Sequence, residues 1–587
     1  MAKNLKVNAC AHRSLERLIV LFVDCQTTGA HPGKGDIIEI GWARSDTFSS
    51  VKTSRTMKTY LVKLPEGRKI PKRTQTVTGI DPDDVAAGHD ACDIWKRLLD
   101  TAENVAHSNH LDVCPTIIHF AKFEEPFLRS MHEKNALGRD FPLSIICTHE
   151  IARRLFPGLP RRGIRAVAGY FGYAVGEYRR CRDHVAATAH IWRELVKILK
   201  EKHNITTLED LQQWLASPVA KGQADRVYPM KIRIRRALPD CPGVYRMLRS
   251  NGDVLYIGKA RSLKKRINSY FRKRSRHPEH ILEMLSQAKQ LDITETESTL
   301  EAAILESDDI KRYAPAYNIA LRKRERTVWF CRADFKEFSP APSRRFRIGP
   351  VVSREKMERL AAIKYIMKAG SSSHVNEDVL LTALGVPPKY APDGTCISAG
   401  FDLFLQHHVS KLHTHSIEHA LTQLGRNLWL QRLKEEKDKD IENNEDEIEE
   451  KIDVWTPETV AHMFESNVRR GMHALRKARW LVLLSESSLV WQDPPFQKNQ
   501  RVLLVFEQGK VVHRENMTPR TEIPIPPGFR RTFSERQQNF DLMTMDRMRV
   551  VTAEMRRIVS AGRWVKLCLR PTVTLDRDKL AKMLQWI

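Results

Sequence analysis

The sequence predicts an α/β protein built from several domains. Its 587 residues correspond to about four units at a typical domain size of ~150 residues. Short apolar runs of strand length occur together with longer stretches in which apolar residues recur every three or four positions, as in amphipathic helices. Apolar residues make up 42% and charged residues 29% of the chain, which is typical of a globular protein and excludes a disordered, solvating one.

Membrane and secreted classes are also disfavoured. No apolar run approaches the ~18 residues of a membrane span. The most apolar early stretch, Leu18 to Val23, has strand length, and no signal-peptide cleavage pattern follows it. The ten cysteines are scattered without a C-x-x-C pair, which argues against a zinc ribbon or a disulfide framework. We therefore expect a cytoplasmic protein with no membrane partner.

The charge of the chain indicates its kind of partner. Lysine and arginine number 97 against 71 acidic residues, a net charge of +26 with a pI near 9.7. Such an excess predicts a polyanion, because basic side chains placed on phosphates release counterions. A basic surface that only aids solubility is the alternative. One acidic block, residues 434–453, is interpreted as a surface insertion.

Breaks in composition divide the chain. Turn-forming residues near 216–230 precede a basic run, and helical periodicity ends after Asn318. The expected parts are a first domain over 1–215, a basic linker over 216–237, a central domain over 238–325, and a C-terminal domain, α/β or mainly helical and of unknown role, over 326–587.

The N-terminal part begins with two predicted strands. Leu18 to Val23 is a continuous apolar run, as in a strand buried on both faces, and Ile37 to Trp42 is the next strand. Side chains alternate along a strand, so Asp24 and Gln26 project to the same face. Two carboxylates in that arrangement can share a metal ion, but here the second residue is a glutamine.

An ordered set of motifs over about residues 17–198 resembles the DnaQ-type proofreading exonucleases of the DEDD superfamily, which have an RNase H-like fold. The motifs are Val23-Asp24-Cys25-Gln26-Thr27-Thr28-Gly29, Ile38-Glu39-Ile40-Gly41, Val77-Thr78-Gly79-Ile80, His119-Phe120-Ala121-Lys122-Phe123-Glu124 with Phe127-Leu128, and Arg182-Asp183-His184 with Ala187-Thr188.

The resemblance implies four carboxylates that hold two metal ions, and a general base that activates water. Asp24 and Asp183 match the first and last carboxylates and are the expected metal ligands. Gln26 takes the place of the second acid, Glu124 that of the usual aspartate, and Tyr178 that of the usual histidine base.

Three of these five positions depart from the pattern. A glutamine brings no charge, and a tyrosine with a pKa near ~10 is a poor base at neutral pH. His184 neighbours Asp183, but adjacent helix residues point about 100° apart, so it is not expected to replace the base. Two interpretations stay open: a degenerate domain retained for DNA binding or docking, and a slow or altered exonuclease.

The central part predicts a hairpin and two helices. Val244 to Leu248 and Val254 to Ile257 flank an Asn-Gly pair, a strong signal for a hairpin turn. The following helix has its apolar stripe at Leu263, Ile267, Tyr270 and Phe271, and a later one covers about 298–313.

This region resembles the GIY-YIG nuclease domain, and more narrowly the N-terminal incision domain of UvrC-type excinucleases and the Cho endonuclease. The resemblance rests on Pro242-Gly243-Val244-Tyr245, Tyr256-Ile257-Gly258-Lys259-Ala260, Leu263-Lys264-Lys265-Arg266 with Tyr270-Phe271, Glu306, and Ile310-Lys311 with Pro315-Ala316-Tyr317-Asn318.

The resemblance implies a catalytic set for hydrolysis of a phosphodiester. Glu306 is the lone protein ligand of one Mg²⁺ or Mn²⁺, and no small-molecule cofactor is expected. Tyr245 and Tyr256 sit on paired strands, and one of them orients or deprotonates the attacking water; which one stays open. The other members balance phosphate charge or close the site: Arg266, Lys259 and Asn318.

The same region is suited to hold DNA. Between residues 225 and 330 there are 23 basic and 13 acidic residues, a net charge of +10. Contacts to the duplex backbone carry no sequence information. The expected DNA-binding residues are Lys264, Lys265, Tyr270, Arg272, Lys273 and Arg274.

Together these observations predict a metal-dependent DNA endonuclease that nicks damaged duplex DNA in nucleotide excision repair. Its partners are expected to include UvrA- and UvrB-type repair proteins. One alternative is mainly a 3′–5′ exonuclease, with the chemistry in the N-terminal part. The other is a non-catalytic DNA-binding repair scaffold, which the departures at the N-terminal site favour and the complete central motif opposes.

Overall fold

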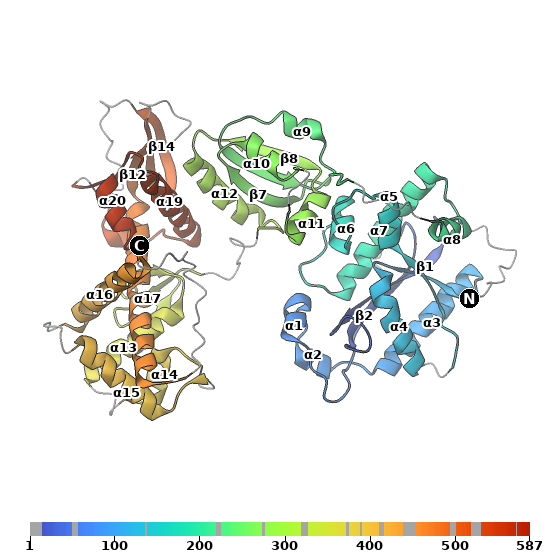
Figure 1. Ribbon diagram of the computed structural model, residues 1–587, viewed down its shortest axis with the longest axis horizontal. Helices are drawn as coiled ribbons and strands as arrows, with labels where there is room; N and C mark the ends of the chain where they lie inside the picture. The colour runs from blue at the N-terminus through green and yellow to red at the C-terminus, as the bar shows by residue number, and fades with distance from the viewer. Residues whose placement is uncertain are drawn as a thin grey trace. The chain divides into compact units, whose positions relative to one another are not determined.

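The computed structural model forms two units, each described by itself. The first contains residues 1–296 and 313–319, and the second residues 297–312 and 320–587. Figure 1 shows the elements along the chain. The residues that the structure describes are 14–49, 57–135, 138–218, 225–272, 276–318, 327–370, 375–387, 390–409, 416–437, 454–492, 501–517, 530–570 and 572–587.

A mixed five-stranded sheet, in the order β3-β2-β1-β4-β5, organises the N-terminal part of the first unit. Strands β1 and β2 are antiparallel, as are β2 and β3, while β4 runs parallel to both β1 and β5. The two strands predicted from the sequence are present as β1 and β2 and are longer than expected. The five strands are β1 (Ile19–Thr27), β2 (Ile37–Asp46), β3 (Lys58–Leu61), β4 (Cys114–Ile118) and β5 (Leu143–Cys147).

Helices cover both faces of this sheet. Val20 and Phe22 of β1 share a core cluster with Trp192, whereas Leu21 and Val23 share another with Trp95. This alternation explains why β1 is continuously apolar. The helices are α1 (Lys72–Thr78), α2 (Pro82–Ala86), α3 (Ala91–Asn109), α4 (Ala121–Asn135), α5 (Thr148–Leu155), α6 (Ile164–Tyr170), α7 (Cys181–His203) and α8 (Leu208–Ala216).

The predicted hairpin lies in a second sheet of the first unit, an antiparallel sheet in the order β7-β6-β8. Gly252 in the turn has φ of +89°, a conformation that favours glycine. The elements are α9 (Ile232–Arg236), β6 (Gly243–Leu248), β7 (Val254–Ala260), α10 (Leu263–Ser269), α11 (Glu279–Gln287) and β8 (Gln290–Glu295).

The second unit contains a small three-stranded sheet in the order β10-β9-β11 and a five-stranded antiparallel sheet in the order β14-β13-β12-β15-β16. Its strands are β9 (Trp329–Cys331), β10 (Phe338–Ser339), β11 (Ile348–Val351), β12 (Ser487–Trp491), β13 (Arg501–Glu507), β14 (Lys510–Met517), β15 (Val565–Arg570) and β16 (Val573–Asp576).

Helices of the second unit include the one expected near 298–313, which is present as α12. A π-helical turn, η3, directly follows α15. The helices are α12 (Thr299–Tyr313), α13 (Arg354–Ala369), α14 (Glu377–Leu384), α15 (Gly394–Phe404), η3 (Leu405–Val409), α16 (Ile417–Lys437), α17 (Pro457–Leu484), α18 (Phe533–Gln537), α19 (Leu542–Ser560) and α20 (Arg577–Leu584).

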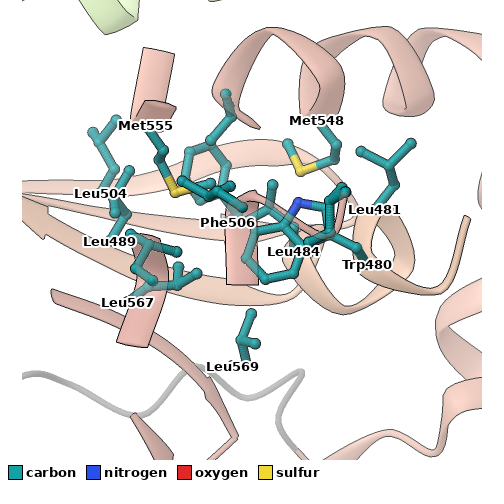
Figure 2. Packing of buried hydrophobic residues seen from close by; sticks show 14 of the residues in the cluster. Trp480, Leu481, Leu484, Leu489, Leu504, Phe506, Met548, Met555, Leu567 and Leu569 are labelled. Atoms are coloured by element: carbon teal, nitrogen blue, oxygen red, sulfur yellow. The ribbon is translucent and has the colours of Figure 1, made fainter. Parts of the chain in front are cut away.

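One of the two large cores of the second unit lies against its larger sheet. Figure 2 shows Trp480 and Leu484 of α17 packed with Phe506 of β13 and with Met548 and Met555 of α19. The chain is thus a mixed α/β protein of several domains, as the sequence predicted. The domain boundaries at 215, 237 and 325 stay predictions, and the acidic block beyond residue 437 lies outside the described residues.

Among the helices described, none combines the length and apolar composition needed to cross a membrane.

Candidate active sites

A hydrogen-bonded cluster of tyrosines lies on one face of the β6–β7 hairpin. Tyr245 is completely buried, and its hydroxyl lies 2.9 Å from the hydroxyl of Tyr270. Arg266 of α10 donates from Nη2 to the Tyr270 hydroxyl at 3.2 Å. The ring centroids of Tyr245 and Tyr256 are 6.1 Å apart. The structure therefore brings together Tyr245, Tyr256 and Arg266, and it adds Tyr270 to them.

The strand register explains this arrangement. Tyr245 is paired with Gly258, so Tyr256, two residues away on β7, lies diagonally opposite Tyr245 on the same face. A Cβ atom at Gly258 would lie 2.5 Å from the Tyr245 hydroxyl oxygen. Glycine at this position therefore leaves the space that the Tyr245 side chain occupies.

The two hairpin tyrosines differ in environment. Burial, and then the neighbouring Tyr270 and Tyr256, raise the pKa of Tyr245 well above its usual value, while Arg266 acts in the opposite direction. Burial lowers the pKa of Arg266, but Tyr245 and Tyr270 outweigh it and raise that pKa overall. Tyr256 is only partly buried. Tyr245 is therefore neutral and internal at neutral pH, and Tyr256 is the one with access to solvent.

Asn318 and Lys259 occupy different places on strand β7. Asn318 is 8% exposed, and its Oδ1 accepts from the Ile257 backbone N–H at 2.9 Å while its Nδ2 donates to the Ile257 carbonyl at 2.8 Å. The Asn318 amide thus pairs with the outer edge of β7 as a neighbouring strand does. Lys259 is exposed and paired with Val244, so the register directs it to the face opposite the tyrosines.

Glu306 is half-buried on α12 in the second unit. Leu300 of the same helix belongs to that unit's core, and Arg547 Nε donates to Asp308 Oδ1 at 2.7 Å. The residue predicted to bind the metal is therefore carried by a firmly anchored helix. A single carboxylate fits Mg²⁺ or Mn²⁺, since such hard cations complete their shells with water and substrate oxygens.

Three of the six predicted DNA-binding residues are exposed side chains: Lys264, Lys265 and Arg272. Lys265 lies 3.6 Å from Asp240 in an exposed ion pair. Tyr270 is 6% exposed, so its hydroxyl belongs to the tyrosine cluster and not to the surface. The remaining two, Lys273 and Arg274, lie outside the described residues.

A second group of polar side chains is buried in the N-terminal part. Gln26 Nε2 donates to Asp24 Oδ2 at 2.8 Å, which confirms that the two side chains share a face of β1. His184 Nδ1 lies 3.1 Å from Asp24 Oδ1. Glu124 of α4 accepts the Cys25 backbone N–H at 3.2 Å. The structure thus assembles Asp24, Gln26 and Glu124 as expected, with His184 as the fourth member.

Asp183 and Tyr178 are placed differently from these buried residues. Asp183 is exposed at the start of α7. Tyr178 is 58% exposed, and its ring packs on Gly79. Successive helix residues point about 100° apart, so only one of the two neighbours can face Asp24. The structure shows that this residue is His184 and not Asp183. The spacing of Cys181, His184, Val185 and Thr188 along the buried face of α7 was the sequence signal for this orientation.

The electrostatics of this group follow from its burial. Burial and then the Asp24 carboxylate raise the pKa of Glu124 well above its usual value. Burial lowers the pKa of His184, but the Asp24 carboxylate outweighs it, and the pKa is raised overall. The contact with Asp24 thus favours the protonated form of the His184 imidazole.

This donor set does not fit two divalent cations. N–H groups of Gln26 and His184 engage the two oxygens of Asp24, and Gln26 adds no negative charge. Within the described part of the chain there is also no group of three or more His, Cys, Asp or Glu side chains that could hold a metal ion. The pair of metals that the exonuclease resemblance implies has no matching site here.

Two family models match the chain. Residues 241–319 match a model described as a UvrC-like GIY-YIG domain, and residues 21–187 match one described as an exonuclease. Both resemblances found in the sequence are thereby confirmed. The UvrABC system protein C of Psychrobacter sp. (strain PRwf-1) is 42% identical over 108 residues, which are 18% of this chain and 17% of that protein. The chain thus spans about a sixth of the length of the curated relatives it matches.

Solved structures give the same two likenesses. The GIY-YIG N-terminal endonuclease domain of UvrC from Thermotoga maritima, bound to magnesium, is 35% identical; the match covers 15% of this chain and 100% of that one, with a TM-score of 0.14. E. coli Exonuclease I in complex with a dT13 oligonucleotide is 14% identical; the match covers 39% of this chain and 48% of that one, with a TM-score of 0.26.

Both matched domains are nuclease domains, and they indicate a phosphodiester hydrolase.

Proposed function

We propose that this chain, which carries an exonuclease domain at residues 21–187 and a UvrC-like GIY-YIG domain at residues 241–319, is a metal-dependent endonuclease that nicks damaged duplex DNA. The observation that carries the proposal is the cluster of Tyr245, Tyr256, Tyr270 and Arg266 on the hairpin, next to a strand edge that Asn318 holds. The excess of basic residues in this region suits a phosphate backbone.

In this proposal the residues of the chain divide the work on the phosphodiester. Tyr256, the more accessible tyrosine, orients the attacking water through its hydroxyl group. Arg266 offsets the negative charge that develops on the phosphate, and its bond to Tyr270 keeps its guanidinium in place. Glu306 holds the Mg²⁺ or Mn²⁺, which supplies charge neutralisation at the phosphate and the leaving oxygen.

The N-terminal domain contributes little or altered exonuclease activity in this proposal. A two-metal mechanism needs free carboxylate oxygens on neighbouring side chains. Those of Asp24 face N–H donors, and the nearby positions are filled by Gln26 and His184. The alternative that the chain is mainly a 3′–5′ exonuclease therefore has less support than the endonuclease function.

The proposal includes a role in nucleotide excision repair, which the names of the relatives support. Several matching curated proteins are named UvrABC system protein C, which suggests lesion-containing duplex as substrate and proteins of the UvrA and UvrB type as partners. These partners belong to the proposal, because the match covers only the central domain.

A nicking assay on damaged supercoiled plasmid tests the proposal. We expect the parent protein to nick in Mg²⁺ or Mn²⁺ and to stop when the metal is chelated. Glu306→Gln and Tyr256→Phe should each lower the rate by about 10²-fold or more, the usual loss when one group that stabilises the transition state is removed. Matched exposed positions serve as controls: Glu201→Gln and Tyr390→Phe.

Two outcomes overturn the proposal in different ways. If both site variants nick as fast as the parent, the site is assigned to the wrong residues. If the parent does not nick with either metal, the non-catalytic scaffold replaces the enzyme. End-labelled single strands separate the exonuclease alternative, since release of mononucleotides that is lost in Asp24→Ala would place the chemistry in the N-terminal domain.

A further inference from the structure

Within the first unit, the exonuclease domain (residues 21–187) and the GIY-YIG domain (residues 241–319) meet along helices α6 and α11, which lie side by side (Figure 1). The approach is close because α6 presents Gly169. A Cβ atom at Gly169 would lie 1.9 Å from Gln287 Oε1 and 2.3 Å from its Cδ. Gln287 is completely buried. Any larger residue at position 169 therefore displaces the Gln287 side chain.

A chain of hydrogen bonds leads from Gln287 to Tyr317, near the C-terminal end of the GIY-YIG domain. Gln287 Nε2 donates to the Tyr317 hydroxyl at 2.6 Å, and this hydroxyl donates to Glu283 Oε1, also at 2.6 Å. Arg165 of α6 lies 3.6 Å from Glu283, with its guanidinium carbon 5.8 Å from the centre of the Tyr317 ring. Tyr317 is 7% exposed. A residue of the exonuclease domain thus helps to set the position of Tyr317.

Tyr317 is directly followed by Asn318, which pairs with β7. The Tyr317 backbone N–H donates to the Leu255 carbonyl at 3.1 Å, and the two Asn318 amide bonds to Ile257 follow along the strand. Tyr256 lies between Leu255 and Ile257. Since β7 is the edge strand of its sheet, these bonds secure the side of β7 that β6 does not.

We propose that the exonuclease domain positions strand β7, which carries Tyr256, in the GIY-YIG domain. It does so through the contacts of α6 with Gln287, Glu283 and Tyr317. Arg165 and Gly169 are positioning residues in this role, because neither lies in the tyrosine cluster. The inference rests on the proposed endonuclease function. It gives the exonuclease domain a part in the reaction of the GIY-YIG domain.

Two variants of α6 test the proposal: Arg165→Ala removes the ion pair and the contact with the Tyr317 ring, and Gly169→Leu forces Gln287 aside. We expect each to lower kcat for plasmid nicking by about tenfold or more, with duplex affinity and the metal concentration for half activity unchanged. A small misplacement of reacting groups has effects of this size. Arg165→Lys, which keeps the charge opposite Glu283, should restore part of the loss.

Hydrogen exchange gives a readout that does not depend on activity. The Ile257 amide is protected by Asn318, so the peptide spanning 254–260 should exchange faster in Arg165→Ala and Gly169→Leu than in the parent. Arg153→Ala, on the exposed ion pair with Glu150, is the matched control and should leave exchange and kcat unchanged.

The results separate this inference from the proposed function. A parent protein that nicks, with both variants nicking at the parental kcat and showing parental exchange in 254–260, overturns the positioning role alone. Faster exchange with unchanged kcat overturns it as well, because β7 would then be loosened without consequence. A parent that does not nick contradicts the proposed function, while the exchange measurement still decides whether α6 secures β7.

Discussion

Single side chains decide the chemistry of the N-terminal group. His184 brings a second nitrogen donor to an aspartate that already accepts from Gln26. A buried carboxylate is stable when hydrogen-bonded cations or N–H groups surround it, and the same groups keep a metal ion out. The N–H groups that stabilise the buried Asp24 thus also occupy the oxygens with which it would bind a metal ion.

The His184–Asp24 pair predicts a pH dependence of stability. The folded pKa of His184 is raised, so its contribution is complete below the unfolded pKa of ~6.5 and is lost as pH rises through the folded value. His184→Asn should therefore destabilise the protein more at pH 6 than at pH 8.5, by about 1.4 kcal/mol for each unit of pKa shift.

Thermal unfolding midpoints of the parent and the variant, measured across this pH range, give the comparison. His203→Asn, at an exposed position of the same helix, is the control and should show a constant difference. A His184→Asn effect that grows with pH would mean that the folded protein holds His184 neutral.

Helix α12 links the candidate metal ligand to the second unit. Arg547 Nε–H is shared between the two carboxylate oxygens of Asp308, at 2.7 and 3.0 Å, and Lys311 lies 3.0 Å from Asp546. Arg514 donates to Glu301 at 2.8 Å. The GIY-YIG motif places α12 with the hairpin in the sequence, but the helix packs with the C-terminal residues because its apolar face, including Leu300, completes their core.

Removing this anchoring should destabilise the second unit. Leu300→Ala deletes a completely buried side chain and should cost about 2–5 kcal/mol of unfolding free energy. Arg547→Ala leaves Asp308 without its charged hydrogen bond and should cost about 1–3 kcal/mol. Denaturant unfolding followed by tryptophan fluorescence measures both.

The control for this experiment is an exposed ion pair in the same unit. Arg577→Ala removes the contact with Asp578, which is open to solvent, and should change the unfolding free energy by less than about 1 kcal/mol. If Leu300→Ala costs no more than Arg577→Ala, α12 is not part of the core in solution.

For the whole molecule, +10 of the net charge of +26 lies in residues 225–330, which include the tyrosine cluster. The basic excess near the tyrosine cluster, with exposed Lys264, Lys265 and Arg272, suits a duplex backbone. Binding through phosphates releases counterions, so affinity should fall steeply with salt and depend little on sequence.

Neutralising two of these charges tests that placement. Lys264→Ala with Arg272→Ala should weaken binding about equally for different duplex sequences and reduce the slope of log K against log[salt] by about 2. Fluorescence anisotropy of a labelled duplex, measured at about 50 to 200 mM salt, gives the affinity and its dependence on salt. Lys202→Ala, exposed on α7, should leave the slope unchanged; an equal loss there would point to a diffuse basic surface.

The amino-acid sequence alone identified two nuclease domains, the hairpin and the tyrosine pair, because these depend on short spacings and on strand alternation. Tertiary contacts decided the rest. They turned His184 toward Asp24, assigned α12 to the second unit, and connected α6 of one domain to Asn318 of the next. The packing of α12 and α6 depends on which distant faces bury each other, and contacts across tens to hundreds of residues leave no local pattern in the chain. For His184, the spacing of the buried residues along α7 did indicate the orientation.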